Sequence, residues 1–220
     1  MKLSNPTSLA ILVAFMPLTA RSQTPQTATD AIGATKGGES AVIINGDNAA
    51  FAYEMKTEIS TPKESLAKIL SSDYRDAPDE FTAKELFGKL EPVIDKRLAE
   101  AKKTKLWSVD IRAQLSEYDF KTSGFPTNLA ASTFLTYDPN YAVRFSNSPE
   151  FGSLPVALDE AKHLANKLQK DRTINLIVEG AITEAKEQTL NRYARKVIIM
   201  KISRITMKLA DETVIGSFGK

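Results

Sequence analysis

The chain of 220 residues contains no cysteine and a single histidine, His163. The missing thiols exclude disulfide bridges, thiolate zinc sites, iron–sulfur clusters, a cysteine nucleophile and a lipid anchor on an N-terminal cysteine. A transition-metal site or a Ser–His–acid triad would have to use His163, and no G-x-S-x-G motif presents a serine. P-loop and G-x-G-x-x-G motifs are missing too. The sequence therefore predicts no metal and no other cofactor.

Long apolar runs are also scarce. The one notable run near the N-terminus, Leu9–Ala20, follows the positive Lys2 and is too short for a membrane span of about 20 residues. Small residues at Ala20 and Ser22 are typical of a signal-peptide cleavage site just before Gln23. We therefore expect residues 1–22 to be a signal peptide. The mature chain is expected to be exported, periplasmic or extracellular, with no transmembrane segment.

Charge of one sign is not in excess, because the formal net charge is only +2. This balance gives no specific signal for nucleic acid. Residues 23–46 are poor in large apolar side chains, and we expect a flexible linker there. Residues 47–220 are expected to form one domain, mainly helical over 47–105 and containing a sheet plus a helix over 106–220.

Two N-terminal helices are predicted from their capping patterns. Thr61 is followed by Pro62 and Glu64, and Thr82 is followed by Glu85, so each threonine is predicted to be an N-cap. Pro92 is predicted to kink or restart the second helix. A weaker helical pattern covers 48–59. These N-terminal helices are expected to lie against an edge or an end of the sheet.

Alternating apolar and polar residues predict about five strands in the C-terminal half. Short connections between them favour antiparallel pairing. The predicted fold is therefore α+β, a curved, mainly antiparallel sheet packed by a helix over 157–170. The predicted strands cover 107–116, 141–145, 172–185, 196–209 and 214–218.

The densest run of aliphatic residues after the N-terminus is Lys196–Leu209, predicted to be a central strand. Its apolar positions change phase around Ser203-Arg204, which predicts a β-bulge there. A similar change of phase, to Tyr118 and Phe120, predicts a second bulge near Ser116-Glu117.

The candidate functional residues are basic ones in the C-terminal strands. A basic strand face suits an anionic envelope surface or another exported protein, but it is equally typical of a solvated sheet face. The six residues of this possible contact face are Arg192, Arg195, Lys196, Lys201, Arg204 and Lys208.

No catalytic constellation is present, so the sequence favours an exported, non-catalytic binding or accessory protein of unknown ligand. One alternative is a cell-wall or glycan hydrolase that uses carboxylates, with Asp110, Glu117 and Asp119 as the first suspects. The other is a protein inhibitor or secretion-system accessory component that engages its partner through a sheet edge.

Overall fold

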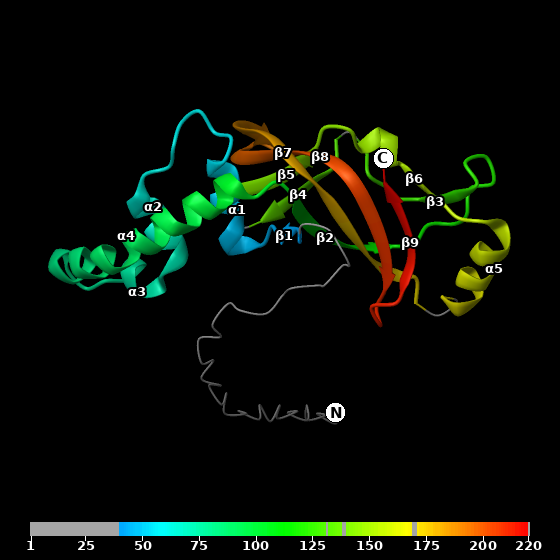
Figure 1. Ribbon diagram of the computed structural model, residues 1–220, viewed down its shortest axis with the longest axis horizontal. Coiled ribbons are helices and arrows are strands. Elements are labelled where there is room, and N and C mark those ends of the chain that lie inside the picture. Colours follow the sequence, from blue (N-terminus) through cyan, green and yellow to red (C-terminus); the bar gives the residue numbers. More distant parts are fainter. Residues whose placement is uncertain (1–39, 131, 138–139, 169–170, 220) are drawn as a thin grey trace, which may run out of the picture. The chain divides into compact units, whose positions relative to one another are not determined.

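A seven-stranded, mainly antiparallel sheet organises the chain in the computed structural model (Figure 1). The structure describes residues 40–130, 132–137, 140–168 and 171–219, all within the unit Thr35–Lys220. The predicted signal peptide and most of the predicted linker lie outside the described residues. The strands of this sheet are β1 (Val42–Ile43), β2 (Trp107–Gln114), β4 (Phe134–Tyr137), β5 (Tyr141–Phe145), β7 (Thr173–Leu190), β8 (Tyr193–Leu209) and β9 (Val214–Gly219).

The strand order is β1-β2-β7-β8-β5-β4, and β9 pairs with β8 off this path. The sheet is not closed, and the β1–β2 and β5–β8 pairs are parallel while the others are antiparallel. The α+β class and the mainly antiparallel sheet are thus confirmed. The predicted five strands are too few, because β1 and β4 are too short to show an alternating pattern. A separate two-stranded sheet pairs β3 (Gly124–Pro126) with β6 (Ser153–Pro155).

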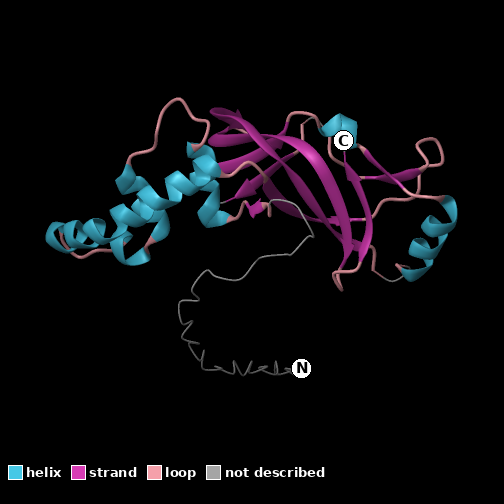
Figure 2. Cartoon of the chain, in the orientation of Figure 1, coloured by secondary structure: helices cyan, strands magenta, loops and turns pink. Residues whose placement is uncertain are grey.

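The long hairpin of β7 and β8 runs through the centre of the sheet (Figure 2). Glu179 is opposite Arg204 and Gly180 is opposite Ile202, so Ser203 is an extra residue in β8. The buried residues of β8 accordingly change from Ile198, Met200 and Ile202 to Ile205, Met207 and Leu209. The bulge predicted at Ser203-Arg204 is confirmed.

The bulge predicted near Ser116-Glu117 is wrong, because β2 ends earlier, at Gln114. The Arg172 guanidinium donates hydrogen bonds to the carbonyl oxygens of Leu115 (2.8 Å) and Ser116 (2.6 Å). These bonds hold the chain that follows β2 beside Arg172. The change of phase in the sequence marks the end of a strand.

The helix that packs on the sheet is α1 (Gly46–Glu54), which contacts β5, β7 and β8. All of its residues from Ala49 to Glu54 are buried, and the Tyr53 ring meets the Tyr141 ring edge-on at 6.0 Å. The predicted packing helix corresponds to α5 (Leu158–Lys167), which lies beyond the ends of the strands instead (Figure 1). Its Lys167 pairs with Asp211 in the turn after β8.

The remaining helices are α2 (Lys63–Leu70), α3 (Ser72–Arg75), α4 (Glu80–Lys103) and the 3-10 helix η1 (Ser148–Phe151). Both predicted threonine caps are wrong. The α4 helix begins one turn earlier than Thr82, because the Asp79 carboxylate accepts the N–H groups of Phe81 and Thr82. Thr61 lies before Pro62, the N-cap residue of α2, and its hydroxyl donates a hydrogen bond to Glu54. Helix α4 continues through Pro92 without a restart.

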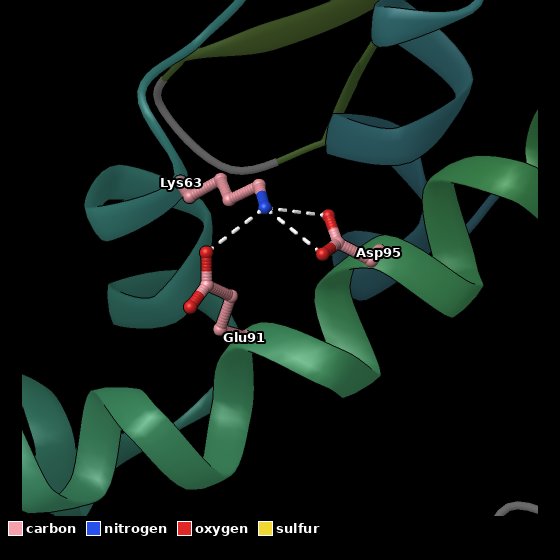
Figure 3. Close-up of polar contacts among 3 residues, drawn as sticks. All are labelled: Lys63, Glu91 and Asp95. Atoms are coloured by element: carbon pink, nitrogen blue, oxygen red, sulfur yellow. Dashed lines mark hydrogen bonds and ion pairs between the residues drawn. The ribbon is translucent and has the colours of Figure 1, made fainter.

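Figure 3 shows how α2 is tied to α4. The Lys63 ammonium lies 3.0 Å from Glu91 Oε1 and 2.7 Å from Asp95 Oδ1. Hydrogen bonds to Asp95 and Glu91 raise the pKa of Lys63 above its ordinary value. Since Lys63 directly follows Pro62, this tether fixes the start of α2 and the chain that leads into it.

Candidate functional site

The structure distributes the six basic candidates over the length of β8 and the turn before it. Arg192 lies in the β7–β8 turn with a positive φ of 70°. Lys201 is exposed, Arg204 lies 3.7 Å from Glu179, and Lys208 lies 3.0 Å from Glu212. Arg195 and Lys196 are the two that the structure brings together at a cavity.

That cavity, which we call the basic cleft, has a volume of about 720 Å³. It lies between the N-terminal end of α1, the helices α2 and α3, and the beginnings of β5 and β8. Four basic residues and two acidic residues contribute to its wall, so its charged lining is net positive. They are Lys68, Arg75, Arg195 and Lys196, and Asp47 and Glu187.

Lys196 is held by several contacts. Its Nζ donates a hydrogen bond to Thr61 Oγ1 at 2.6 Å and lies 5.3 Å and 5.8 Å from the ring centroids of Tyr53 and Tyr141. Two aromatic faces near an ammonium group stabilise its charge. The residue directly opposite Lys196 on β7 is Glu187. The ammonium group is therefore placed by α1, β5 and the chain before α2 together.

Thr61 connects Lys196 to a buried acid. The Thr61 hydroxyl donates to Glu54 Oε1 at 2.5 Å, and the Thr61 N–H donates to the same carboxylate. Glu54 ends α1 and is only 9% exposed. A buried carboxylate needs such partners, because an unpaired one costs several kcal/mol. The chain at Thr61 is consequently fixed to both α1 and β8.

A second pocket of about 520 Å³ lies on the other side of this connection. Thr61, Pro62, Glu187 and Lys196 line both cavities, so they form the boundary between them. The rest of the second pocket is formed by the chain over 56–60, by Tyr53 and by the β7 segment 184–186. Its charged lining is balanced, with three lysines and three glutamates.

The local sequence explains why the first turn of α1 lies at the cleft. Asn45 caps the helix, accepting the Asn48 N–H at 3.0 Å, and the Asn48 side chain donates to the Ile43 carbonyl oxygen of β1. Alanine-rich sequence then allows close approach to the sheet. Gly46 and Asp47, in the first turn, line the basic cleft.

The carboxylates suspected of hydrolase chemistry do not share a strand. Asp110 lies in β2, where burial raises its pKa. Asp119 lies after the strand, and its carboxylate accepts the Lys121 N–H and the Thr122 hydroxyl. Glu117 lies in the same connection, and none of the three lines either cavity. His163 lies on α5, away from both cavities.

Sequence reasoning missed most of the cleft. Glu54 had a usable signal, since an acid inside the apolar run Ala49–Met55 must find a buried partner. Thr61 was interpreted as a helix cap, which concealed its contact with Lys196. Lys68 and Arg75 gave no signal, because single basic residues on helices are usually solvated.

The comparisons with known proteins give one match. Residues 65–167 match the family described as "Domain of unknown function (DUF4852)". This range runs from α2 to the end of α5 and includes Lys68, Arg75 and Tyr141 of the basic cleft. No curated protein and no solved structure matches the chain.

No helix among the described residues is long and apolar enough to cross a membrane. Across the same residues, no group of three or more histidine, aspartate or glutamate side chains is arranged to hold a metal ion.

Proposed function

We propose that the protein is an exported, non-catalytic binding protein that holds a small oxyanion, a carboxylate or a phosphate, in the basic cleft. The observation that carries this proposal is the excess of four basic over two acidic residues around one cavity. The volume of about 720 Å³ lies within the range of small-molecule sites.

The chemistry of the lining supports an anion with several oxygens. Arg75 and Arg195 bring guanidinium groups, which bind carboxylate or phosphate oxygens in pairs, and Lys68 and Lys196 add two ammonium groups. These cations come from α2, α3 and β8, so an anion bound among them would be surrounded rather than touched on one side. The Ser65 hydroxyl adds a neutral donor.

The hydrogen bonds that the reactive groups of the cleft already make favour binding without catalysis. The Thr61 hydroxyl contacts a carboxylate, but it donates to Glu54 and accepts from Lys196. No histidine lines the cleft. A fixed ammonium suits recognition of an anion.

Isothermal titration calorimetry at low ionic strength tests the proposal with two probes, inorganic phosphate and citrate. We expect at least one to bind to a single site. Lys68→Ala and Arg75→Ala should each weaken binding roughly tenfold or more, since hydrogen bonds to charged groups contribute about 1.5–3 kcal/mol. The control Lys201→Ala removes an exposed cation outside both cavities and should change nothing. Failure of both probes to bind would contradict the proposal.

The exported location rests on the N-terminal sequence pattern alone and has its own test. Intact mass measurement of the protein from fractionated cells should give a mature chain that begins at Gln23. A chain that retains Met1 in the cytosol would contradict export while leaving the anion site untouched.

A further inference from the structure

The edge of β7 is open over half its length. Strand β2 pairs with β7 only over Thr173–Gly180, whereas β8 pairs with it on the other side as far as Leu190. Among the described residues, no strand covers the outer edge of β7 from Ala181 to Leu190. An open edge presents backbone N–H and C=O groups that can pair with another extended chain.

The second pocket runs along this open edge. Four consecutive residues, Glu184 to Glu187, line it. Successive side chains of a strand point to opposite faces of the sheet, so a cavity on one face would touch only alternate residues. A cavity lined by all four residues reaches around the open edge, where a further strand would lie, and it continues over the face that carries Tyr53 and Lys196.

The side chains around the pocket determine which side chains a strand bound there would need. Ala185 is buried on the face that α1 covers, and the pocket is also lined by the apolar groups of Tyr53, Ile59 and Pro62. On the opposite face are Glu184 and Lys186, whose charged groups lie 2.6 Å apart. One apolar side chain between two charged ones would match this pattern.

We propose that the second pocket binds an extended peptide, which adds a strand to β7 between Ala181 and Leu190. An apolar peptide residue lies opposite Ala185, an acidic residue beside Lys186 and a basic residue beside Glu184. Antiparallel pairing is the arrangement of both existing neighbours of β7, and it gives the order acidic–apolar–basic along the peptide. The volume of about 520 Å³ suits a short segment of chain.

A peptide matches the pocket better than the other occupants of an open edge. The pocket has equal numbers of acidic and basic residues, which favours a ligand of both charges over a simple anion. The chain over 56–62 forms the opposite wall, which leaves room for a narrow segment more readily than for a folded second copy. This inference goes beyond the anion site and does not rest on it.

The test compares two capped pentapeptides of identical composition, Thr-Glu-Val-Lys-Thr and its reverse, Thr-Lys-Val-Glu-Thr. Amide NMR titration of the full mature chain should show shifts over Ala181–Leu190 with the first peptide. The reversed peptide places like charges together at two positions and should bind roughly three- to tenfold more weakly, since each cross-strand charge pair contributes about 0.2–1 kcal/mol. Replacing the central valine by proline should abolish binding.

A charge swap in the protein provides the matched control. In the double variant Glu184→Lys, Lys186→Glu, the preference between the two peptides should invert. The variant Arg75→Ala should leave peptide binding unchanged, which separates this site from the basic cleft.

Three outcomes would overturn the proposal: no shifts along β7 with either peptide, equal affinity for both, or a preference that the charge swap leaves intact. Concentration-dependent self-association that the charge swap disrupts and the peptides do not would instead assign the edge to a second copy of the chain.

Discussion

Lys196 Nζ lies 2.6 Å from Thr61 Oγ1, although the two residues are 135 positions apart in the sequence. Through Thr61 the ammonium is linked to the buried carboxylate of Glu54, which accepts both the hydroxyl and the N–H of Thr61. Because Thr61 and Lys196 line both cavities, this connection sets the boundary between the basic cleft and the second pocket.

Thr61→Val tests the connection. The substitution keeps the shape of the side chain but removes the hydroxyl that donates to Glu54 and accepts from Lys196. We expect a loss of about 1–3 kcal/mol in the free energy of unfolding, because the buried carboxylate loses a hydrogen bond. Chemical denaturation measures it. The neighbouring exposed Ser60→Ala should stay within about 0.5 kcal/mol of the parent, and equal effects of the two changes would contradict this account.

Gly180→Ala tests the bulge between β7 and β8. A Cβ at Gly180 would lie 2.2 Å from the Lys201 carbonyl oxygen, so the two strands would have to move apart. We expect a destabilisation of about 1–3 kcal/mol, the usual cost of forcing extra atoms into a packed interior. Gly88→Ala is the control, because its Cβ in α4 would meet nothing within 4 Å. That change should stabilise by about 0.5–1 kcal/mol. Thermal unfolding of both variants gives the comparison.

Tyr137 gives a prediction at alkaline pH. Burial, with a contribution from the charge of Asp110, raises the pKa of Tyr137 to about 12. The folded state therefore favours the neutral phenol, while the unfolded chain ionises near the ordinary value of 10. The stability contributed by this group should be fully present below pH 10 and lost as the pH rises toward 12. Denaturation curves of the parent and of Tyr137→Phe should diverge in that window, and parallel curves would contradict the assignment.

Asp79 gives a prediction for the start of α4. Hydrogen bonds from the Thr82 backbone and hydroxyl, and from the Phe81 N–H, lower its pKa below 3.8. A lowered pKa adds stability above the ordinary value, and that stability is lost as the pH falls through the folded value. Asp79→Ala should weaken the start of α4 at neutral pH, as followed by hydrogen exchange of its first turn. Asp79→Asn should keep much of the protection, because asparagine is an equally good cap.

The β8 strand could be predicted in detail because its apolar and polar residues alternate along the sequence. The change of phase at Ser203 appears in the sequence and in the pairing register alike. The change of phase at Tyr118 led to the wrong prediction of a β-bulge, because a strand that ends and a strand that bulges give the same change of phase.

Helix α1 was predicted only as a weak helical pattern over 48–59, because its residues from Ala49 to Glu54 are all buried. A helix with apolar residues all around lacks the periodic polar face by which helices are recognised. The short strands β1 and β4 could not be assigned for a related reason, since two to four residues cannot establish a period.

The candidate site was predictable only in part. Arg195 and Lys196 belonged to the basic set named from the sequence, and they line the cleft. Lys68 and Arg75, which line the same cleft, and Glu54, which binds Thr61, come from distant segments. Only the packing of α1 on β7 and β8, and of α2 and α3 on α4, brings these segments to the cleft. Contacts over such separations leave no local pattern.

Site-resolved lysine acetylation tests the central claim, an anion held in the basic cleft, most directly. The mature protein is labelled with an acetylating reagent with and without saturating citrate or phosphate, and modification at each lysine is quantified by mass spectrometry. We predict that the anion slows labelling of Lys68 and Lys196, which line the cleft, and leaves the exposed Lys201 unchanged. Equal labelling of Lys68 and Lys196 with and without the anion, or equal protection of all three lysines, would contradict the account.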